Sequence, residues 1–146
     1  SMAACPSSTP TQPLTLGLNS RLMEDARHNA HINNITNCTF VEGRVEEKLP
    51  GVLNKLSHSS SIVAVVNPGR GGAGESAISL LRQHSNVHKV IYISCKPDNP
   101  LTMKNFVQLC EKFGTGSKPF QLTKAVPVDL FPYTDHCELV LCFEKR

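Results

Sequence analysis

Short apolar runs separated by polar segments recur along the whole chain and predict six strands. They lie at Leu14–Leu18, Asn37–Val41, Ser61–Val66, Val87–Ser94, about 119–128 and about 138–144. The run Ser61–Val66 is the clearest of them, because an unbroken β-branched segment without charges is typical of a strand covered on both faces.

Between these runs, apolar residues repeat every three to four positions, which predicts helices. The first begins after Asn19 or Ser20, either of which can cap it, and carries Leu22, Met23, Ala26 and Ala30. The second covers Arg44–Leu56, where Pro50 is expected to bend or split it. The third follows a Gly-rich loop at 67–74 and continues through Leu81. In the fourth, Asn99 is the cap and Pro100 the first helical residue, ahead of Met103, Phe106, Val107, Cys110 and Phe113.

This order of elements predicts an α/β fold with a mostly parallel sheet and an antiparallel strand pair at its carboxyl end. The predicted domain covers residues 14–146, a length suited to one hydrophobic core. Residues 1–13 are small, polar and Pro-rich, so we expect a disordered leader there. The opening pair Ser1-Met2 is typical of an expression tag remnant.

Charge is distributed unevenly, although the net charge is only +3. Residues 67–124 hold eight Lys and Arg against three Asp and Glu, and this middle segment would suit a polyanionic partner. No apolar run approaches the roughly 18 residues of a membrane span, so no membrane partner is expected. The six cysteines form no Cys-x-x-Cys pair, which argues against a metal site and favours a reducing intracellular compartment.

Candidate chemistry follows the carboxyl ends of the strands, where ligands collect in such sheets. Cys95 ends a strand beside Lys96 and precedes a helix start, and cations and backbone N–H groups favour a nucleophilic thiolate. Glu138 opens an apolar strand, where a partly buried carboxylate suits a general base. On the residues alone, an unreactive structural cysteine and an exposed strand-end carboxylate remain open alternatives.

Three ordered motifs together resemble the RNA uracil-5-methyltransferases. They are Asn-Pro-Gly-Arg at 67–70, Ser-Cys-Lys-Pro at 94–97 and Asp-Leu-Phe-Pro-Tyr-Thr-Asp-His-Cys-Glu at 129–138. The family patterns are Asp-Pro-Pro-Arg, Ser-Cys-Asn-Pro and Asp-x-Phe-Pro-x-Thr-x-His-x-Glu. The likeness is strongest to the animal tRNA (uracil-5-)-methyltransferase homologs and covers about residues 14–146.

The resemblance implies a Rossmann-like class I methyltransferase fold and a reaction that forms 5-methyluridine in tRNA. In this reaction Cys95 would add to uracil C6, and C5 would then attack the methyl group of S-adenosylmethionine. Glu138 would remove the C5 proton so that the thiol can leave. The resemblance also implies that Asn67 contacts the cofactor and that Arg70 and Lys96 contact the RNA.

The chain departs from the family pattern mainly around the cofactor. The Gly-rich cofactor loop and its strand, expected ahead of residue 14, are missing, and Gly17 or Asn19 stands where an acid binds the ribose. Asn67 replaces an Asp, and Gly69 replaces a Pro. We therefore expect the carboxyl-terminal part of a methyltransferase domain, with little cofactor binding and no activity of its own.

A sheet without its first strand would have two unpaired edges. Either the leader with Leu14–Leu18 fills this gap, or a second chain does, which would make a homo-oligomer.

Two other function classes remain open on the sequence. One is a non-catalytic RNA-binding or interaction module that kept the fold and lost the cofactor site. The other is a thiol hydrolase using Cys95, His136 and Asp135, for which no residue defines an acyl substrate. The modified uridine, the tRNA species and the choice between cytosol, nucleus and mitochondrion are also left open.

Overall fold

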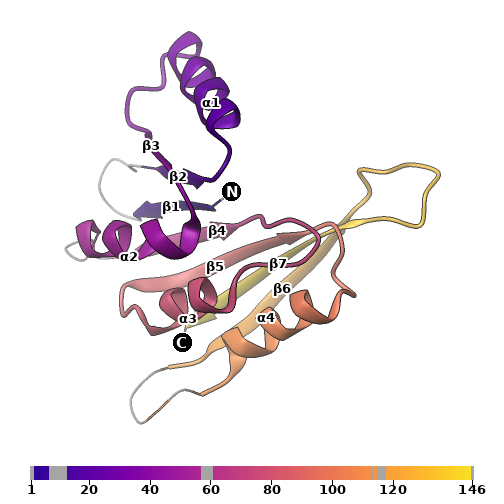
Figure 1. Cartoon of the computed structure of the whole chain (residues 1–146). Coiled ribbons are helices and arrows are strands. Elements are labelled where there is room, and N and C mark those ends of the chain that lie inside the picture. The colour runs from indigo at the N-terminus through magenta and orange to yellow at the C-terminus, as the bar shows by residue number, and fades with distance from the viewer. Residues whose placement is uncertain (1, 7–12, 57–60, 113, 115–117, 146) are drawn as a thin grey trace.

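A computed structural model describes residues 2–6, 13–56, 61–112, 114 and 118–145 (Figure 1). The strands are β1 Met2–Pro6, β2 Leu14–Gly17, β3 Thr39–Glu42, β4 Ile62–Val66, β5 Val87–Ser94, β6 Phe120–Val128 and β7 Glu138–Lys145. The helices are α1 Ser20–Ile32, α2 Val45–Lys55, α3 Glu75–Gln83 and α4 Pro100–Cys110. All six strands predicted from residue 14 onward and all four predicted helices are confirmed, with ends shifted by a few residues.

The strands of the described residues form one seven-stranded sheet in the order β3-β2-β1-β4-β5-β7-β6. The pairs β2–β3 and β4–β5 are parallel, whereas β1 and β7 run antiparallel to both of their neighbours. Five strands therefore share one direction and two oppose it. The predicted α/β class and the antiparallel pair at the carboxyl end are confirmed.

The position between β2 and β4 is filled by β1, so the predicted disordered leader is wrong for residues 2–6. Met2 lies opposite both Leu16 of β2 and Val66 of β4. A parallel crossover needs about a dozen residues or more, and only residues 7–13 join β1 to β2, so β1 must run antiparallel. Residues 7–12 lie outside the described residues. Because both inner edges are paired, the predicted unpaired edges do not exist and give no reason to expect a homo-oligomer.

Helices α2, α3 and α4 form a layer, in which α3 contacts both of the others (Figure 1). Helix α1 contacts β2 and β3 at the other end of the sheet. The side chains of Asn19 and Asn99 accept hydrogen bonds from the first turns of α1 and α4, as predicted. Helix α2 continues through Pro50.

The predicted apolar faces of these helices are confirmed only in part. Met23 and Ala30 are buried, whereas Leu22 of α1 and Met103 and Val107 of α4 are exposed. The predicted end of the fourth helix, Phe113, lies outside the described residues.

The core lies between the sheet and the layer of α2, α3 and α4. In β4 the side chains of Ile62, Ala64 and Val66 are buried, while Val63 and Val65 on the other face are only partly covered. The expectation that this strand is covered on both faces is therefore wrong for the described residues. An unbroken apolar run gives no information about how completely each face is covered.

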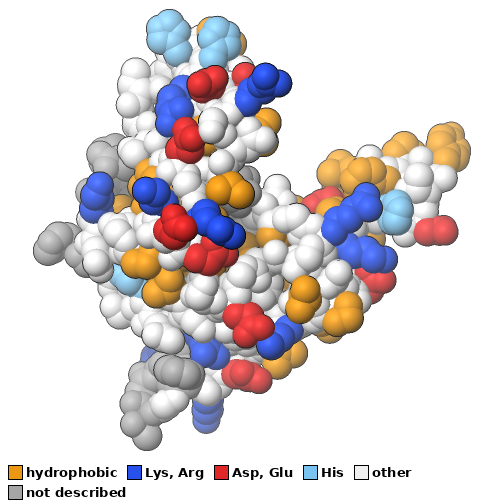
Figure 2. Space-filling view, in the orientation of Figure 1, with side chains coloured by type: hydrophobic (Ala, Val, Ile, Leu, Met, Phe, Trp, Pro, Cys, Tyr) orange, Lys and Arg blue, Asp and Glu red, His pale blue; other side chains and the backbone are white. Residues whose placement is uncertain are grey.

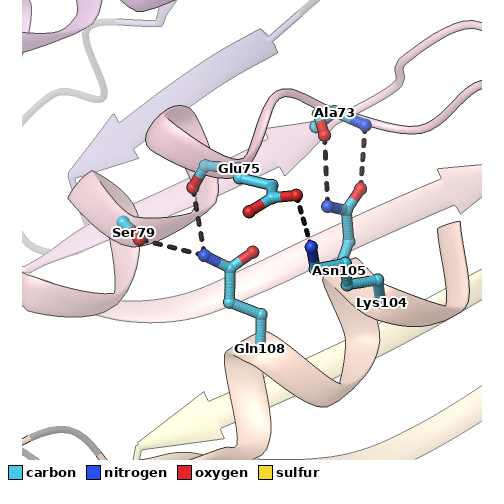
Figure 3. A network of polar contacts seen from close by, with 6 residues as sticks. All are labelled: Ala73, Glu75, Ser79, Lys104, Asn105 and Gln108. Carbon is cyan, nitrogen blue, oxygen red and sulfur yellow. Dashed lines mark hydrogen bonds and ion pairs between the residues drawn. The ribbon is translucent and has the colours of Figure 1, made fainter. Parts of the chain in front are cut away.

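A buried polar network fastens the loop after β4 to β5 and α4, and Figure 3 shows its contacts between Ala73 and Asn105. Asn105 is 1% exposed, and its amide exchanges two hydrogen bonds with the backbone of Ala73, at 2.8 and 3.1 Å. The hydroxyl of Tyr92 donates to Asn105 Oδ1 at 2.9 Å and accepts from the Ala73 N–H at 3.2 Å. Burial raises the pKa of Tyr92, which keeps this phenol protonated as the donor that the network needs.

Substitution Asn105→Ala is expected to lower the free energy of unfolding by about 1–3 kcal/mol, because it leaves buried hydrogen-bonding groups without partners. Chemical unfolding monitored by circular dichroism measures the change. Asn29→Ala is the matched control, since Asn29 lies on the exposed side of α1, and it should stay within about 0.5 kcal/mol of the wild type. Equal stability of the two variants would contradict the importance of the network.

Candidate functional site

A cavity of about 440 Å³ opens at the carboxyl end of β5. Its lining comes from three segments that are far apart in the sequence: Arg70, the group Cys95, Lys96 and Asn99, and the pair Phe131 and His136. This volume falls within the roughly 300–1,000 Å³ of small-molecule sites. The structure thus brings together three of the five predicted site residues, Arg70, Cys95 and Lys96.

Cys95 lies in a tight turn between β5 and α4 that is fixed by local hydrogen bonds. The hydroxyl of the buried Ser94 accepts from the Lys96 N–H at 3.3 Å. The Lys96 carbonyl accepts from the Asn99 N–H at 3.2 Å, and Asn99 in turn caps α4. The thiol of Cys95, which is only partly buried, is therefore held in place by the backbone on both of its sides.

Arg70 lies in the Gly-rich loop that the buried network holds against α4. Gly72 has a φ of +77°, and a Cβ there would meet Asn105 Oδ1 at 2.8 Å and the Thr102 backbone at 3.3 Å. Only glycine fits so close to the helix in this conformation. The loop thus needs glycine for packing against α4, and Arg70 two residues earlier remains exposed.

The third segment of the cavity is the loop Asp129–Cys137 between β6 and β7, which is fixed by its own hydrogen bonds. Asp129 Oδ1 accepts from the Phe131 N–H at 3.3 Å, and the Phe131 carbonyl accepts from the Thr134 hydroxyl at 2.8 Å. The ring of Phe131 meets that of His136 edge-on, with centroids 6.5 Å apart. Both rings line the cavity, so this loop forms the wall that faces Arg70 and Cys95.

Glu138 is the first residue of β7 and is partly buried, as predicted. Ser94 pairs with Leu139 at the last position of the antiparallel β5–β7 ladder, so Cys95 and Glu138 are the residues next to this pair at the same end of the two strands. Glu138 itself pairs with Val128 of β6. Glu138 is not among the cavity-lining residues, although His136, two residues earlier, is one of them.

The charges at this edge are partly paired. Lys96 Nζ lies 3.0 Å from Asp98 Oδ2, and this hydrogen bond lowers the pKa of the exposed Asp98, with a smaller electrostatic contribution from His136. None of the ion pairs between described residues includes Arg70. The Arg70 guanidinium is consequently available to bind an anion that enters this cavity.

Asn67, the fourth predicted residue, directly follows β4 and is exposed, but it does not line the large cavity. A smaller cavity of about 160 Å³ lies beside it, lined by residues that include Glu46, Val66, Pro68 and Gly74. At the same edge, the amino end of β1 lies next to Val66, since Met2 pairs with that residue.

Five cysteines in the described residues are free thiols. Cys110 and Cys137 are exposed, whereas Cys38, Cys95 and Cys142 are partly buried. In the part of the chain that the structure describes, no helix is long and apolar enough to cross a membrane. The same residues contain no group of three His, Cys, Asp or Glu side chains placed to hold a metal ion.

Comparisons with known proteins agree with the three motifs. The family model described as tRNA (uracil-5-)-methyltransferase matches residues 18–146. The chain belongs to this family. It is 46% identical over 128 residues to tRNA (uracil-5-)-methyltransferase homolog B of Danio rerio, covering 84% of this chain and 26% of the relative. Homolog B of Homo sapiens is 43% identical over 136 residues, which cover 90% of this chain and 27% of the relative.

The fold of this family member is shared with a distant methyltransferase of known structure. A precorrin-6y C5,15-methyltransferase from Geobacter metallireducens superposes with a TM-score of 0.57 at 17% identity, covering 90% of this chain and 66% of that one. The predicted methyltransferase fold is therefore confirmed. The chain spans about a quarter of the length of the two curated relatives.

The described residues of this family member do not form a complete site for S-adenosylmethionine. No carboxylate follows β2, where Gly17 ends the strand and the Asn19 side chain is used as the cap of α1. The cavity beside Asn67 is smaller than the roughly 300 Å³ at the lower end of small-molecule sites. Because β1 runs antiparallel to β4, its amino end lies beside Val66. A parallel strand would place its carboxyl end there, followed by a loop that could bind a carboxylate.

Sequence reasoning missed some of the residues that build the cavity. Asn99 was recognised only as a helix cap, and Phe131 only as part of a motif, yet both line it. His136 entered only through the thiol hydrolase alternative. The Asn105 side chain gave no signal at all, because a buried polar residue on a helix looks the same in sequence as an exposed one.

Isothermal titration of this chain with S-adenosylmethionine is expected to show no binding at micromolar concentrations, because the described residues offer neither the ribose carboxylate nor an adequate cavity. A dissociation constant in the micromolar range would contradict this expectation. Circular dichroism of the same sample serves as the control that the chain is folded.

Proposed function

We propose that this chain is the carboxyl-terminal part of an enzyme that converts a uridine in tRNA to 5-methyluridine through a covalent cysteine adduct. The main support is the register of β5 and β7, because Cys95 and Glu138 both adjoin its last pair, Ser94 with Leu139, and Cys95 lines a cavity. A nucleophile and a base that share one sheet edge can act on the two adjacent carbons of a single pyrimidine ring.

In the proposed reaction, the Cys95 thiolate forms a bond to uracil C6, and the electron pair of the C5–C6 double bond becomes available at C5. C5 gains a methyl group, for which S-adenosylmethionine is the donor. The Glu138 carboxylate then takes the proton from C5, the double bond re-forms, and the C6–S bond breaks to release the thiolate.

The basic side chains of the cavity suit a nucleic acid substrate. A base must leave its stack to reach a thiol in a cavity, and the flanking phosphates then need cationic partners. Arg70 is exposed and in no ion pair between described residues, and Lys96, beside Cys95, would exchange its exposed partner Asp98 for a phosphate. We assign the phosphate contacts to these two side chains.

The first test uses the full-length protein that contains this chain, with tRNA carrying 5-fluorouridine and S-adenosylmethionine. Fluorine at C5 cannot leave as a proton does, so the adduct should accumulate and shift the protein on a denaturing gel. Cys95→Ser should abolish this shift. Cys137→Ser is the matched control, since Cys137 is an exposed thiol in the neighbouring loop and should leave the adduct unchanged.

The second test is Glu138→Gln in the same full-length protein. Loss of the base should lower the turnover rate by about 10²–10⁴-fold, and the adduct with ordinary uridine tRNA should accumulate. Glu144→Gln is the control, because Glu144 lies on the same strand six residues after Glu138 and pairs with Lys89 of β5. The activity of this variant should stay within about twofold of the wild type. A Glu138→Gln variant with normal turnover would exclude this residue as the base.

A non-catalytic RNA-binding module remains the second candidate. The observation that favours it is the incomplete cofactor site, with Asn19 committed to a helix cap and only about 160 Å³ beside Asn67. The fluorouridine experiment separates the two candidates: tRNA binding by the full-length protein without a Cys95-dependent adduct supports the module.

A further inference from the structure

The tip of the β6–β7 loop carries a cluster of apolar side chains that the fold does not use. Leu130 is 60% exposed, Phe131 is 39% exposed and Tyr133 is fully exposed. Figure 2 shows hydrophobic side chains gathered on this projecting loop, with Lys and Arg side chains next to its base. An aromatic ring that is fully exposed to water adds no packing energy to the fold, and a cluster of exposed apolar side chains of this kind often marks a binding site.

The backbone at Tyr133 is held in an unusual conformation. Its φ is +64°, and the other non-glycine residue with positive φ among the described residues is Asn34, a type that adopts this region readily. A bulky aromatic residue in the left-handed region is strained, and such strain is concentrated at binding sites. Hydrogen bonds from Thr134 to the Phe131 carbonyl and from the His136 N–H to the Thr134 hydroxyl hold the loop on either side.

The same loop that presents Tyr133 also forms one wall of the cavity around Cys95. Phe131 and His136 line that cavity, whereas Tyr133 lies between them in the sequence and points into solvent. A nucleotide chain whose target base entered the cavity would place its neighbouring base within reach of the loop tip. Arg70 and Lys96 on the cavity rim supply the positive charge that the connecting phosphates need.

We propose that Tyr133 is a stacking platform for an unpaired base adjacent to the uridine that enters the cavity. This inference rests on the proposed function for its choice of RNA as the partner. Single-stranded RNA is bound by aromatic rings that stack on bases together with cations that contact phosphates, and this edge of the molecule offers both. The backbone strain and the loop hydrogen bonds hold the ring ready for this contact.

Direct evidence for stacking comes from a tryptophan placed at the tip. The chain contains no Trp, so Tyr133→Trp creates a single fluorophore in it. Titration with a uridine-containing single-stranded RNA oligonucleotide should quench its fluorescence, whereas inorganic polyphosphate at equal phosphate concentration should not. Leu22→Trp is the control, because Leu22 is 63% exposed on the distant helix α1 and should not be quenched.

Binding measurements separate the ring from the backbone. Tyr133→Ala and Tyr133→Gly should both weaken RNA binding by about fivefold to a hundredfold, the range that loss of one stacked base gives. Tyr133→Phe should bind within about twofold of the wild type. A Gly variant that binds as well as the wild type would show that the ring is not needed, and would overturn the proposal.

Other outcomes also decide against the platform. Equal quenching at positions 133 and 22, no quenching at either, or equal quenching by polyphosphate would each overturn it. A change of oligomeric state in Tyr133→Ala, seen by analytical ultracentrifugation, would instead make the tip a protein interface. Cys95→Ser should leave the quenching intact, so failure of the covalent mechanism and failure of the platform give different results.

Discussion

The hydrogen bonds of Asn105 and Tyr92 with Ala73 are the interaction on which the candidate site depends. They join three segments that are separated in the sequence: the loop after β4, strand β5 and helix α4. The loop carries Arg70, and Cys95 follows directly after β5, so one buried amide joins the segment that carries Arg70 to the strand that leads to Cys95. Because these groups are removed from water, the alternative arrangements leave polar atoms without partners and are disfavoured.

At the carboxyl ends of β4 and β5, the surroundings of Cys95 form a well-defined site, whereas those of Asn67 do not. Around Cys95 there is a cavity of suitable size with a cation, and Glu138 begins the neighbouring strand β7. Around Asn67 there is a small hollow and a strand that runs in the opposite direction. The chain therefore holds the groups that our proposal assigns to the pyrimidine more completely than groups that could bind a methyl donor.

The sequence predicted the parts of the fold that depend on local chemistry. The capping of α1 by Asn19 and of α4 by Asn99, and strand β5 with its bounds Val87–Ser94, follow from side-chain types and spacing. Strand β1 was foreseen only as one of two ways to fill the gap in the sheet, because its residues have no strand pattern and are ordered by pairing with β2 and β4. The assignment of Cys95 and Glu138 to one site came only from family motifs, since the register between distant strands cannot be derived from one sequence.

The short connection before β2 has a consequence for how this sheet could be rebuilt. Strands β2 and β4 share one direction and offer backbone groups to whatever strand lies between them, so the slot itself accepts either orientation. The short connection between β1 and β2 permits only the antiparallel orientation of β1. Lengthening this connection by roughly the dozen residues that a crossover requires would permit β1 to reverse its direction. The carboxyl end of β1 would then lie beside Val66, at the edge of the sheet where Cys95 lies.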